Sequence, residues 1–387
     1  MGRFFIALYG LTALCHIPFA MGLSFALRRA GVPAAPVLAL GAAAGLVALL
    51  RGRVGRARYD KPMPRWQLLL VEEPYYAHWG ATIASVPLTL VILAGSLVVG
   101  TLTSGEGEGL KLATGPGASA LAAYLAGLAL AVWGVFVRRR WVRVRTLDVA
   151  IPDLPPSFDG YRIAQLSDLH IGSLCPRERG YGWARRVNDL DVDLVALTGD
   201  YVTSGVAFHE DIAAVITALK GRDGVVAVMG NHDYFGDGEP LIGLLRGGGV
   251  TVLRNEWKTL ERGGGRVTLA GVDDTWTRRA DVARSLKGRD PALPVIALAH
   301  DPALFPKLAR AGASLVLSGH THWGQIAAPF MATRLNISRL SFRYHAGMYR
   351  EGSSTLYIHP GLGTTGPPIR VGSPPEITIL RLRCEGS

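Results

Sequence analysis

Four long apolar stretches near the start of the sequence constrain this chain more than any other feature. About 20 consecutive apolar residues are enough to cross the hydrocarbon core of a bilayer as a helix. The stretches contain no Asp, Glu, Lys or Arg, and they run over Phe4–Leu27, Val32–Leu50, Ala81–Thr103 and Ala118–Val137. We therefore expect residues 1–140 to form four transmembrane helices and residues 141–387 to form a separate domain.

Basic residues are concentrated in the same part of the chain. Residues 1–145 hold 15 Lys/Arg and 5 Asp/Glu, a net of +10, whereas the remainder holds 26 and 25, a net of +1. Membrane topology and anionic headgroups explain a basic excess beside apolar spans. Nucleic-acid binding is therefore disfavoured.

The distribution of Lys and Arg also predicts an orientation. With the N-terminus inside, twelve basic residues fall in inner segments and three in outer loops, which favours cytoplasmic ends and a cytoplasmic domain after Arg145. If the second stretch does not cross, because of Pro33 and Pro36, this topology is reversed. The inner residues are Arg3, Arg51, Arg53, Arg56, Arg58, Lys61, Arg65, Arg138, Arg139, Arg140, Arg143 and Arg145, and the outer ones are Arg28, Arg29 and Lys111.

Two further features of the apolar region have simple interpretations. His16 lies inside the first stretch. An intramembrane histidine is a candidate functional residue, but we favour a hydrogen-bonded histidine between packed helices. Because the stretches carry no charged residue, we also favour a compact anchor over a transport path.

The sequence after about Val144 alternates short β-rich runs with helical segments, which is typical of a layered α/β fold. Six of the runs end in polar residues, and five of them deliver Asp, Asn or His side chains suited to binding a metal ion. In open α/β sheets the ligand crevice lies beyond the carboxyl ends of the strands. The runs are "YRIAQLSDLH", "VDLVALTGD", "GVVAVMGNHD", "RVTLAGVDD", "PVIALAHDP" and "ASLVLSGHTH".

Seven of these side chains form a set of hard nitrogen and oxygen donors. The three cysteines fit neither a disulfide framework nor a thiolate site, so the donors favour Mn, Fe or Zn ions held without sulfur. One metal needs about four protein ligands, so seven donors with one shared carboxylate suit two ions. The donors are Asp168, His170, Asp200, Asn231, His300, His320 and His322.

The motifs "SDLH", "TGD", "GNHD", "AHD" and "GHTH", in this order, resemble those of the calcineurin-like metallophosphoesterase family. The resemblance covers residues from about 145 onward, and the segment "YIHPGLGTTGPPIRVGSPPEITIL" looks like the closing stretch of the membrane-associated branch of that family. It implies a four-layer metallophosphoesterase β-sandwich flanked by helices, preceded here by the four-helix transmembrane region.

The resemblance also implies roles for individual residues. One metal takes Asp168, His170, Asp200 and His322, and the other takes Asp200, Asn231, His300 and His320, so that Asp200 bridges them. A hydroxide activated by the ions attacks phosphorus in line. The catalytic candidates are His232, as the proton donor to the leaving oxygen, and Asp233, which either orients His232 or caps a helix.

Several other polar and aromatic residues have no assigned role at this stage. For each of them we favour an ordinary structural position, although some could line the substrate side or wall the pocket. They are His209, His345, His359, Arg370, Asp273, Asp274, Tyr201 and Trp323.

These observations predict a membrane-anchored metal-dependent hydrolase of phosphomonoester, phosphodiester or pyrophosphate bonds. Anchoring makes a lipid-linked substrate, such as a UDP-diacylglucosamine-type pyrophosphate, one candidate, with membrane lipids as partners. Three alternatives stay open: a phosphoprotein phosphatase with the same ligands, a catalytically silent membrane receptor or scaffold, and a transporter with an accessory hydrolase.

Overall fold

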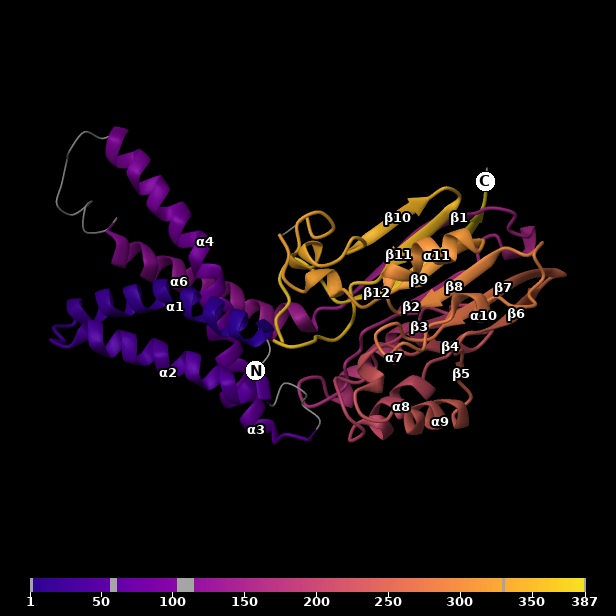
Figure 1. The fold of residues 1–387 in the computed structure, drawn as a ribbon, viewed down its shortest axis with the longest axis horizontal. Coiled ribbons are helices and arrows are strands. Elements are labelled where there is room, and N and C mark those ends of the chain that lie inside the picture. The colour runs from indigo at the N-terminus through magenta and orange to yellow at the C-terminus, as the bar shows by residue number, and fades with distance from the viewer. Residues whose placement is uncertain (1–2, 56–60, 103–114, 329–330, 386–387) are drawn as a thin grey trace. The chain divides into compact units, whose positions relative to one another are not determined.

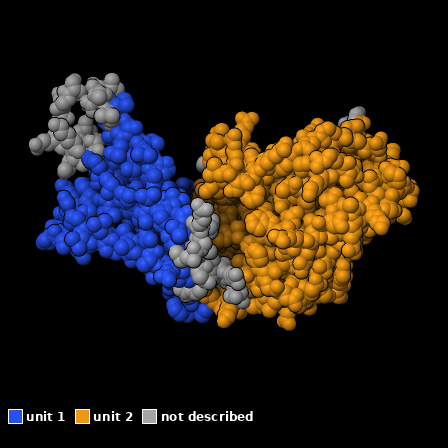
Figure 2. All heavy atoms as spheres, viewed as in Figure 1, with its two compact units in different colours: residues 1–57, 64–138 blue, residues 58–63, 139–387 orange. Residues whose placement is uncertain are grey.

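The computed structural model describes residues 3–55, 61–102, 115–328 and 331–385. The chain divides into two compact units (Figure 2): the first comprises Met1–Ala57 and Pro64–Arg138, and the second comprises Arg58–Met63 and Arg139–Ser387. Thr103, Arg56, Arg58 and Lys111, which were counted in the predicted spans and loops, lie outside the described residues.

The described part of the first unit is entirely helical (Figure 1), and four of its helices are long and apolar enough to span a membrane: Ile6–Arg29, Ala35–Arg53, Arg65–Ser96 and Pro116–Arg140. The helical elements are α1 (Arg3–Arg29), α2 (Ala35–Gly55), α3 (Arg65–Gln67), η1 (Leu68–Glu72), α4 (Glu73–Leu102), α6 (Pro116–Val132) and η2 (Trp133–Val137). The short η3 (Arg138–Arg140) follows η2 and begins at the last residue of the first unit.

The third helix begins at Arg65, well before its apolar stretch at Ala81, and two acidic residues inside it are buried. Glu72 and Glu73 are only 2% and 4% exposed. Arg53 at the end of α2 donates from Nε to Glu72 Oε2 at 2.9 Å, and its guanidinium lies 3.8 Å from the centre of the Tyr75 ring. A hydropathy pattern alone does not indicate that a carboxylate such as that of Glu72 has an arginine as its partner.

A chain of hydrogen bonds joins three of the helices. His16 Nδ1 of α1 lies 2.8 Å from the Thr12 carbonyl oxygen, His16 Nε2 lies 3.2 Å from His78 Nε2 of α4, and His78 Nδ1 lies 2.9 Å from the Tyr124 hydroxyl of α6. Neutral rings satisfy the whole chain if His16 donates from Nδ1 and His78 from Nε2. His16 is therefore a hydrogen-bonded histidine between packed helices.

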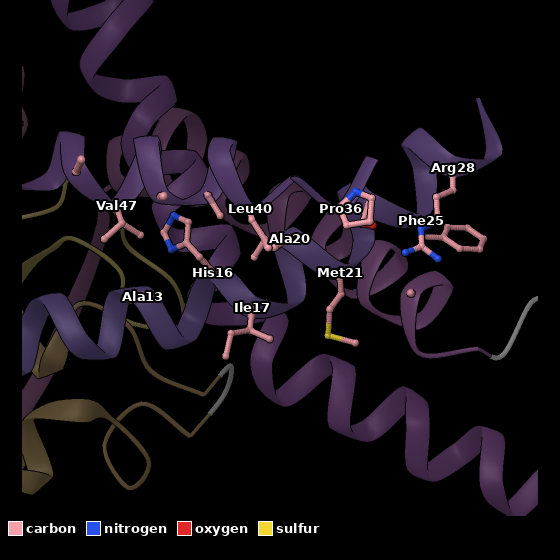
Figure 3. Close-up of a pocket in the computed structure, with 15 residues that line it drawn as sticks. Ala13, His16, Ile17, Ala20, Met21, Phe25, Arg28, Pro36, Leu40 and Val47 are labelled. Carbon is pink, nitrogen blue, oxygen red and sulfur yellow. The ribbon is translucent and has the colours of Figure 1, made fainter. Parts of the chain in front are cut away.

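A cavity of about 850 Å³ lies beside α1 and α2. Its lining is mostly aliphatic, as with Ile17, Met21 and Leu40, and Figure 3 shows His16 and Arg28 toward opposite ends of the labelled residues. A lining of this kind suits hydrocarbon better than a polar solute.

The second unit contains two six-stranded sheets. In the first, the order is β1-β12-β2-β3-β4-β5; β12 pairs in parallel with β1 and antiparallel with β2, and the strands from β2 to β5 are parallel. Its strands are β1 (Arg143–Ile151), β2 (Arg162–Leu166), β3 (Leu194–Thr198), β4 (Val225–Val228), β5 (Thr251–Val252) and β12 (Glu376–Cys384).

The second sheet has the order β10-β11-β9-β8-β7-β6, with the four central strands parallel and both edge strands antiparallel to their neighbours. Its strands are β6 (Glu256–Arg262), β7 (Gly265–Val272), β8 (Val295–Ala299), β9 (Ala313–Ser318), β10 (Gly347–Glu351) and β11 (Ser354–Ile358).

Apolar residues of both sheets form one buried core, in which Leu194 and Val226 of the first sheet join Ile296 and Leu315 of the second. Parallel strands buried on both faces read as continuous apolar runs, and β3, β4 and β8 are buried at every position. Polar bonds also link the sheets near the strand ends, where Gln165 Nε2 of β2 donates to the Ser318 carbonyl oxygen at 3.0 Å.

Helices complete the layers (Figure 1). α7, α8 and α9 share a second buried core with the first sheet, while α10 and α11 pack against β7 and β9. The second unit is therefore an α/β sandwich of two sheets flanked by helices, and the chain before it forms helices long enough to span a membrane. The helices of this unit are α7 (Arg177–Asn188), α8 (His209–Thr217), α9 (Glu239–Gly247), α10 (Val282–Ser285) and α11 (Phe305–Arg310), with short turns η4 (Pro156–Phe158), η5 (His232–Tyr234), η6 (Pro302–Leu304), η7 (His322–Gly324) and η8 (Ile337–Leu340).

Candidate metal centre

The candidate ligands follow the carboxyl ends of five strands, three in the first sheet and two in the second. β2, β3 and β4 end just before Asp168, Asp200 and Asn231, and β8 and β9 end just before His300 and His320. Six of the seven lie in two clusters, within each of which the ligand atoms are no more than 4.8 Å apart. The first cluster is Asp168, His170 and His322, and the second is Asp200, His300 and His320.

The ring nitrogens in each cluster point at one another. His170 Nε2 lies 3.0 Å from His322 Nε2, and His320 Nδ1 lies 3.1 Å from His300 Nε2. His322 Nε2 is also 3.2 Å from Asp168 Oδ1. Lone pairs of neutral imidazoles repel when they converge without a proton or a cation between them, so the donor set fits divalent cations well.

Backbone bonds fix the ring of one candidate ligand. His300 Nδ1 lies 2.7 Å from the Thr198 carbonyl oxygen and donates its proton there, which leaves the Nε2 lone pair directed at the cluster. An orienting bond of this kind is usual for a metal-binding histidine.

Asn231, the seventh candidate, carries an amide and so is not one of the imidazole and carboxylate groups that form the two clusters. Its residue is 5% exposed, and its amide oxygen is buried without a hydrogen-bond partner among the described residues. A buried orphan acceptor costs free energy. The unpartnered amide oxygen of Asn231 is therefore consistent with a position in which this oxygen faces a cation.

Five of the seven candidates have left-handed backbone conformations. Their φ angles are 53° at Asp168, 46° at His170, 57° at Asp200, 72° at His320 and 53° at His322. Such angles are uncommon for residues other than glycine and cost free energy, so they persist where the surrounding structure requires them. Here they turn the side chains toward the clusters directly after the strands.

Two glycines allow the chain to pass close to these carboxylates. A Cβ atom at Gly230 would collide with the Asp200 carboxylate, and one at Gly319 would collide with Ser167 Oγ and Asp168 Oδ2. The glycines before the "NHD" and "HTH" motifs are therefore required by close approach.

His232 lies beside the first cluster, half-buried at the start of η5. Its Nδ1 donates to the Thr203 carbonyl oxygen at 2.6 Å, and its backbone N–H donates to Asp200 Oδ1 at 2.9 Å. The ring lies 4.8 Å from the His170 ring, edge to face. The remaining ring nitrogen, Nε2, is thus free to serve a ligand at the centre.

Asp233, for which the sequence left two roles open, orienting His232 or capping a helix, bonds to the backbone of two loops. It is 1% exposed, and its carboxylate accepts hydrogen bonds from the backbone N–H groups of Asp200, Tyr201, Val202 and Gly230. It therefore locks the loop after β3 to the loop after β4, and acts on the site through the backbone.

Burial and neighbouring charges shift the pKa values of two residues of the site, His300 and Asp233. Burial alone would lower the pKa of His300, but the Asp200 carboxylate overrides it and raises that pKa to about 10. Burial, with the nearby charge of Asp200, raises the pKa of Asp233 to about 7. A cation that binds at His300 must therefore displace a firmly held proton.

The residues without an assigned role occupy structural positions. Asp273 accepts from the Tyr234 hydroxyl and Arg254 Nε, and Asp274 accepts from Thr277. Tyr201 and Trp323 donate to buried carbonyl oxygens. His209, His345 and His359 belong to neither cluster.

Arg370 is nearer to the site than the other unassigned residues. It is fully buried and donates to the carbonyl oxygens of Pro360 and Gly363, with Nη2 3.3 Å from His322 Nδ1. It braces the segment behind His322 and does not face open solvent.

Sequence reasoning missed several neighbours of the centre. The Thr203 carbonyl oxygen that holds His232 has no sequence signature. The rings of Trp276 and Phe342 pack on His320 with centroids 5.4 and 5.3 Å away, and Phe235 packs on His232. Only their aromatic character, close to a ligand-bearing loop, could have indicated these residues.

Paired hard-cation clusters with an adjacent imidazole suit displacement at phosphorus, where cations stabilise the charge of the transferring group. The second unit thus defines a metal-dependent phosphoester hydrolase. The chain belongs to the calcineurin-like metallophosphoesterase family: the family model described as calcineurin-like phosphoesterase matches residues 161–324, and relatives in bacteria and animals are named metallophosphoesterases.

Two relatives illustrate this similarity. The uncharacterized metallophosphoesterase YkuE of Bacillus subtilis is 32% identical over 234 residues, 59% of this chain and 82% of that protein. A transmembrane protein with metallophosphoesterase domain from Danio rerio is 34% identical over 268 residues, 66% of this chain and 60% of that protein. Together with the four apolar helices, the second relative indicates a membrane protein.

Among solved structures, the phosphopantetheinyl hydrolase PptH of Mycobacterium tuberculosis is similar with a TM-score of 0.35 and 13% identity, covering 52% of this chain and 89% of that chain.

Proposed function

We propose that this protein is a dinuclear phosphoesterase that cleaves phosphomonoester, phosphodiester or pyrophosphate bonds at a membrane surface. The position of the Asp200 carboxylate carries the proposal. Its Oδ2 atom lies 3.2 Å from His300 Nε2 in one cluster and 3.7 Å from His170 Nε2 in the other. A carboxylate between two ligand clusters is suited to bridging two ions.

In this proposal Asp168, His170, Asp200 and His322 hold one ion, and Asp200, Asn231, His300 and His320 hold the other. When bound, Mn, Fe or Zn ions supply the Lewis acidity that activates water and stabilises phosphoryl charge. The protein orients the ligands through the Thr198 carbonyl oxygen and through the strained loops after the strands.

His232 supplies the proton for the leaving group. With Nδ1–H fixed on the Thr203 carbonyl oxygen, a protonated ring presents its second N–H from Nε2. That atom gives its proton to the leaving oxygen as the bond to phosphorus breaks. Asp233 is a positioning residue, because it holds the backbone on which both Asp200 and His232 depend.

A His232→Gln variant should separate proton donation from metal binding. General-acid catalysis contributes about 10²- to 10⁴-fold, so kcat should fall by that order for an alkyl phosphoester, whose leaving oxygen needs a proton. The fall should be much smaller for a nitrophenyl ester, and metal content should not change. His345→Gln, outside the centre, is the matched control. Equal losses for both ester types would contradict the assigned role.

Metal analysis of the detergent-purified protein, together with a panel of phosphoesters, tests the function itself. We expect two divalent ions per chain, loss of hydrolysis on chelation and recovery on adding Mn, Fe or Zn. One ion per active chain would contradict the dinuclear proposal. The panel should include a lipid pyrophosphate and a phosphopeptide.

We further propose a lipid-linked substrate and a catalytic unit on the cytoplasmic side. Four apolar helices and the excess of basic residues in the inner segments support both. Preference for the phosphopeptide in the panel would favour a phosphoprotein phosphatase instead.

Labelling of Cys384 in right-side-out vesicles by an impermeant reagent would overturn the proposed cytoplasmic orientation of the catalytic unit.

A further inference from the structure

A segment of the second unit carries many apolar side chains exposed to solvent. Residues 331–343, between β9 and β10 and including η8, have the sequence MATRLNISRLSFR. Met331, Leu335, Ile337 and Leu340 are 44%, 47%, 61% and 86% exposed. Figure 1 shows the connection between β9 and β10 as orange-to-yellow loops beyond the ends of the strands. We call residues 331–343 the η8 segment.

The η8 segment is also purely basic. It contains Arg334, Arg339 and Arg343, and the sequence has no Asp or Glu from Pro302 to Arg350. All three arginines are exposed. Arg343 lies 3.8 Å from Glu351 with its side chain 80% exposed, a geometry that leaves it largely hydrated. Exposed apolar side chains interspersed with arginines are typical of segments that lie in a membrane interface.

Hydrogen bonds hold this arrangement in place. Asn336 accepts from the Arg339 backbone N–H through Oδ1 at 3.2 Å and donates from Nδ2 to the Ala332 carbonyl oxygen at 2.7 Å. Ala328 N–H donates to the Leu335 carbonyl oxygen at 2.8 Å. The apolar side chains therefore project from an ordered turn whose backbone polar groups are engaged.

The η8 segment adjoins the metal centre. The Phe342 ring packs edge to face on His320 with centroids 5.3 Å apart. Thr321, between the two histidines of the "HTH" motif, donates to the His345 carbonyl oxygen at 2.8 Å. A surface that contacts the η8 segment therefore lies next to the loop after β9 that carries His320 and His322.

We propose that the η8 segment is a docking surface for an anionic lipid bilayer. Leu335, Ile337 and Leu340 enter the headgroup and acyl boundary, and the arginines bind lipid phosphates. The bilayer is the partner that the chain itself brings close, because only Trp141 and Val142 separate η3, the end of the last spanning helix, from β1. Docking adds to the hydrolytic function and does not depend on it.

Docking can be measured on the full chain in nanodiscs. In a Cys384→Ser background, where Cys15 and Cys175 are buried, a polarity-sensitive dye is attached at Leu340→Cys. The matched reference position is Glu261→Cys on β6, the edge strand of the second sheet that lies opposite β10. We expect brominated acyl chains to quench the dye at position 340, more strongly with phosphatidylglycerol than with phosphatidylcholine alone, and to leave the dye at position 261 little affected.

Charge variants test the role of the arginines. Each arginine near an anionic surface changes the ratio of docked to undocked protein about fivefold, so Arg334→Gln/Arg339→Gln should lower this ratio, calculated from the quenched fraction of the dye, by that order per residue. Arg266→Gln/Arg284→Gln removes the same charge elsewhere on the unit and should not.

Three outcomes would overturn the proposal. They are equal quenching at positions 340 and 261, quenching that is indifferent to anionic lipid, and a dye shielded from water yet unquenched by bromine, which would indicate a protein partner or a second copy. Hydrolysis of a soluble nitrophenyl phosphodiester, measured on the same samples, reports separately on the proposed function. The quenching result tests docking independently of whether the protein hydrolyses the diester.

Discussion

Asp200→Ala should abolish hydrolysis while leaving a folded protein. The variant removes the carboxylate that lies within 3.2 to 3.7 Å of histidines in both clusters, so the affinity for both ions should fall together. Cation stabilisation contributes several kcal/mol at the transition state, so kcat/KM should fall by about a thousandfold or more. Metal content by mass spectrometry should fall from two ions to at most one.

Asp189→Ala, an exposed acid on the same unit, is the matched control and should keep both ions and full turnover. Thermal unfolding of the metal-free forms of both variants checks that the fold survives. An Asp200→Ala protein that retained two ions or wild-type turnover would refute the dinuclear assignment.

Glu72→Gln should strongly destabilise the helical unit. The pair formed by Arg53 and Glu72 has side chains only 6% and 3% exposed. Removing one partner of such a pair leaves a buried charge uncompensated, at a cost of about 3–5 kcal/mol. Thermal stability of the purified protein in detergent, followed by size-exclusion chromatography, measures the loss.

The double variant Arg53→Met/Glu72→Leu distinguishes a missing partner from a general defect. Replacing both members of a buried pair with apolar residues is often neutral or stabilising, so the double variant should be more stable than Glu72→Gln. If it were as unstable as the single variant, the ion pair would not be the cause.

The donors of the site could be predicted because each follows a strand in the sequence. Strand ends at Leu166, Thr198 and Ser318 are visible as apolar runs, and parallel packing brings them to one edge. Asp273 also follows such a run, but Tyr234 and Arg254 bind it instead. The contacts of Asp233 with four backbone N–H groups depend on two loops far apart in sequence, so no local pattern could indicate them.

The third long helix begins at Arg65, well before the apolar stretch that starts at Ala81. The helix includes Glu72 and Glu73, and Arg53, 19 residues earlier, pairs with Glu72. Hydropathy treats every carboxylate as hydrated, and only tertiary structure reveals which one has a counter-ion. The candidate helix Ala35–Arg53 overlaps the predicted stretch Val32–Leu50.

The strand order of the first sheet has a consequence for how the protein is made. β12 (Glu376–Cys384) lies between β1 and β2, although both neighbours are synthesised long before it. Until residues 376–384 leave the ribosome, β1 and β2 each present an unpaired edge, and unpaired edges are prone to aggregation. The nascent chain should therefore depend on chaperones late in translation, and premature stops just before this strand should yield insoluble fragments.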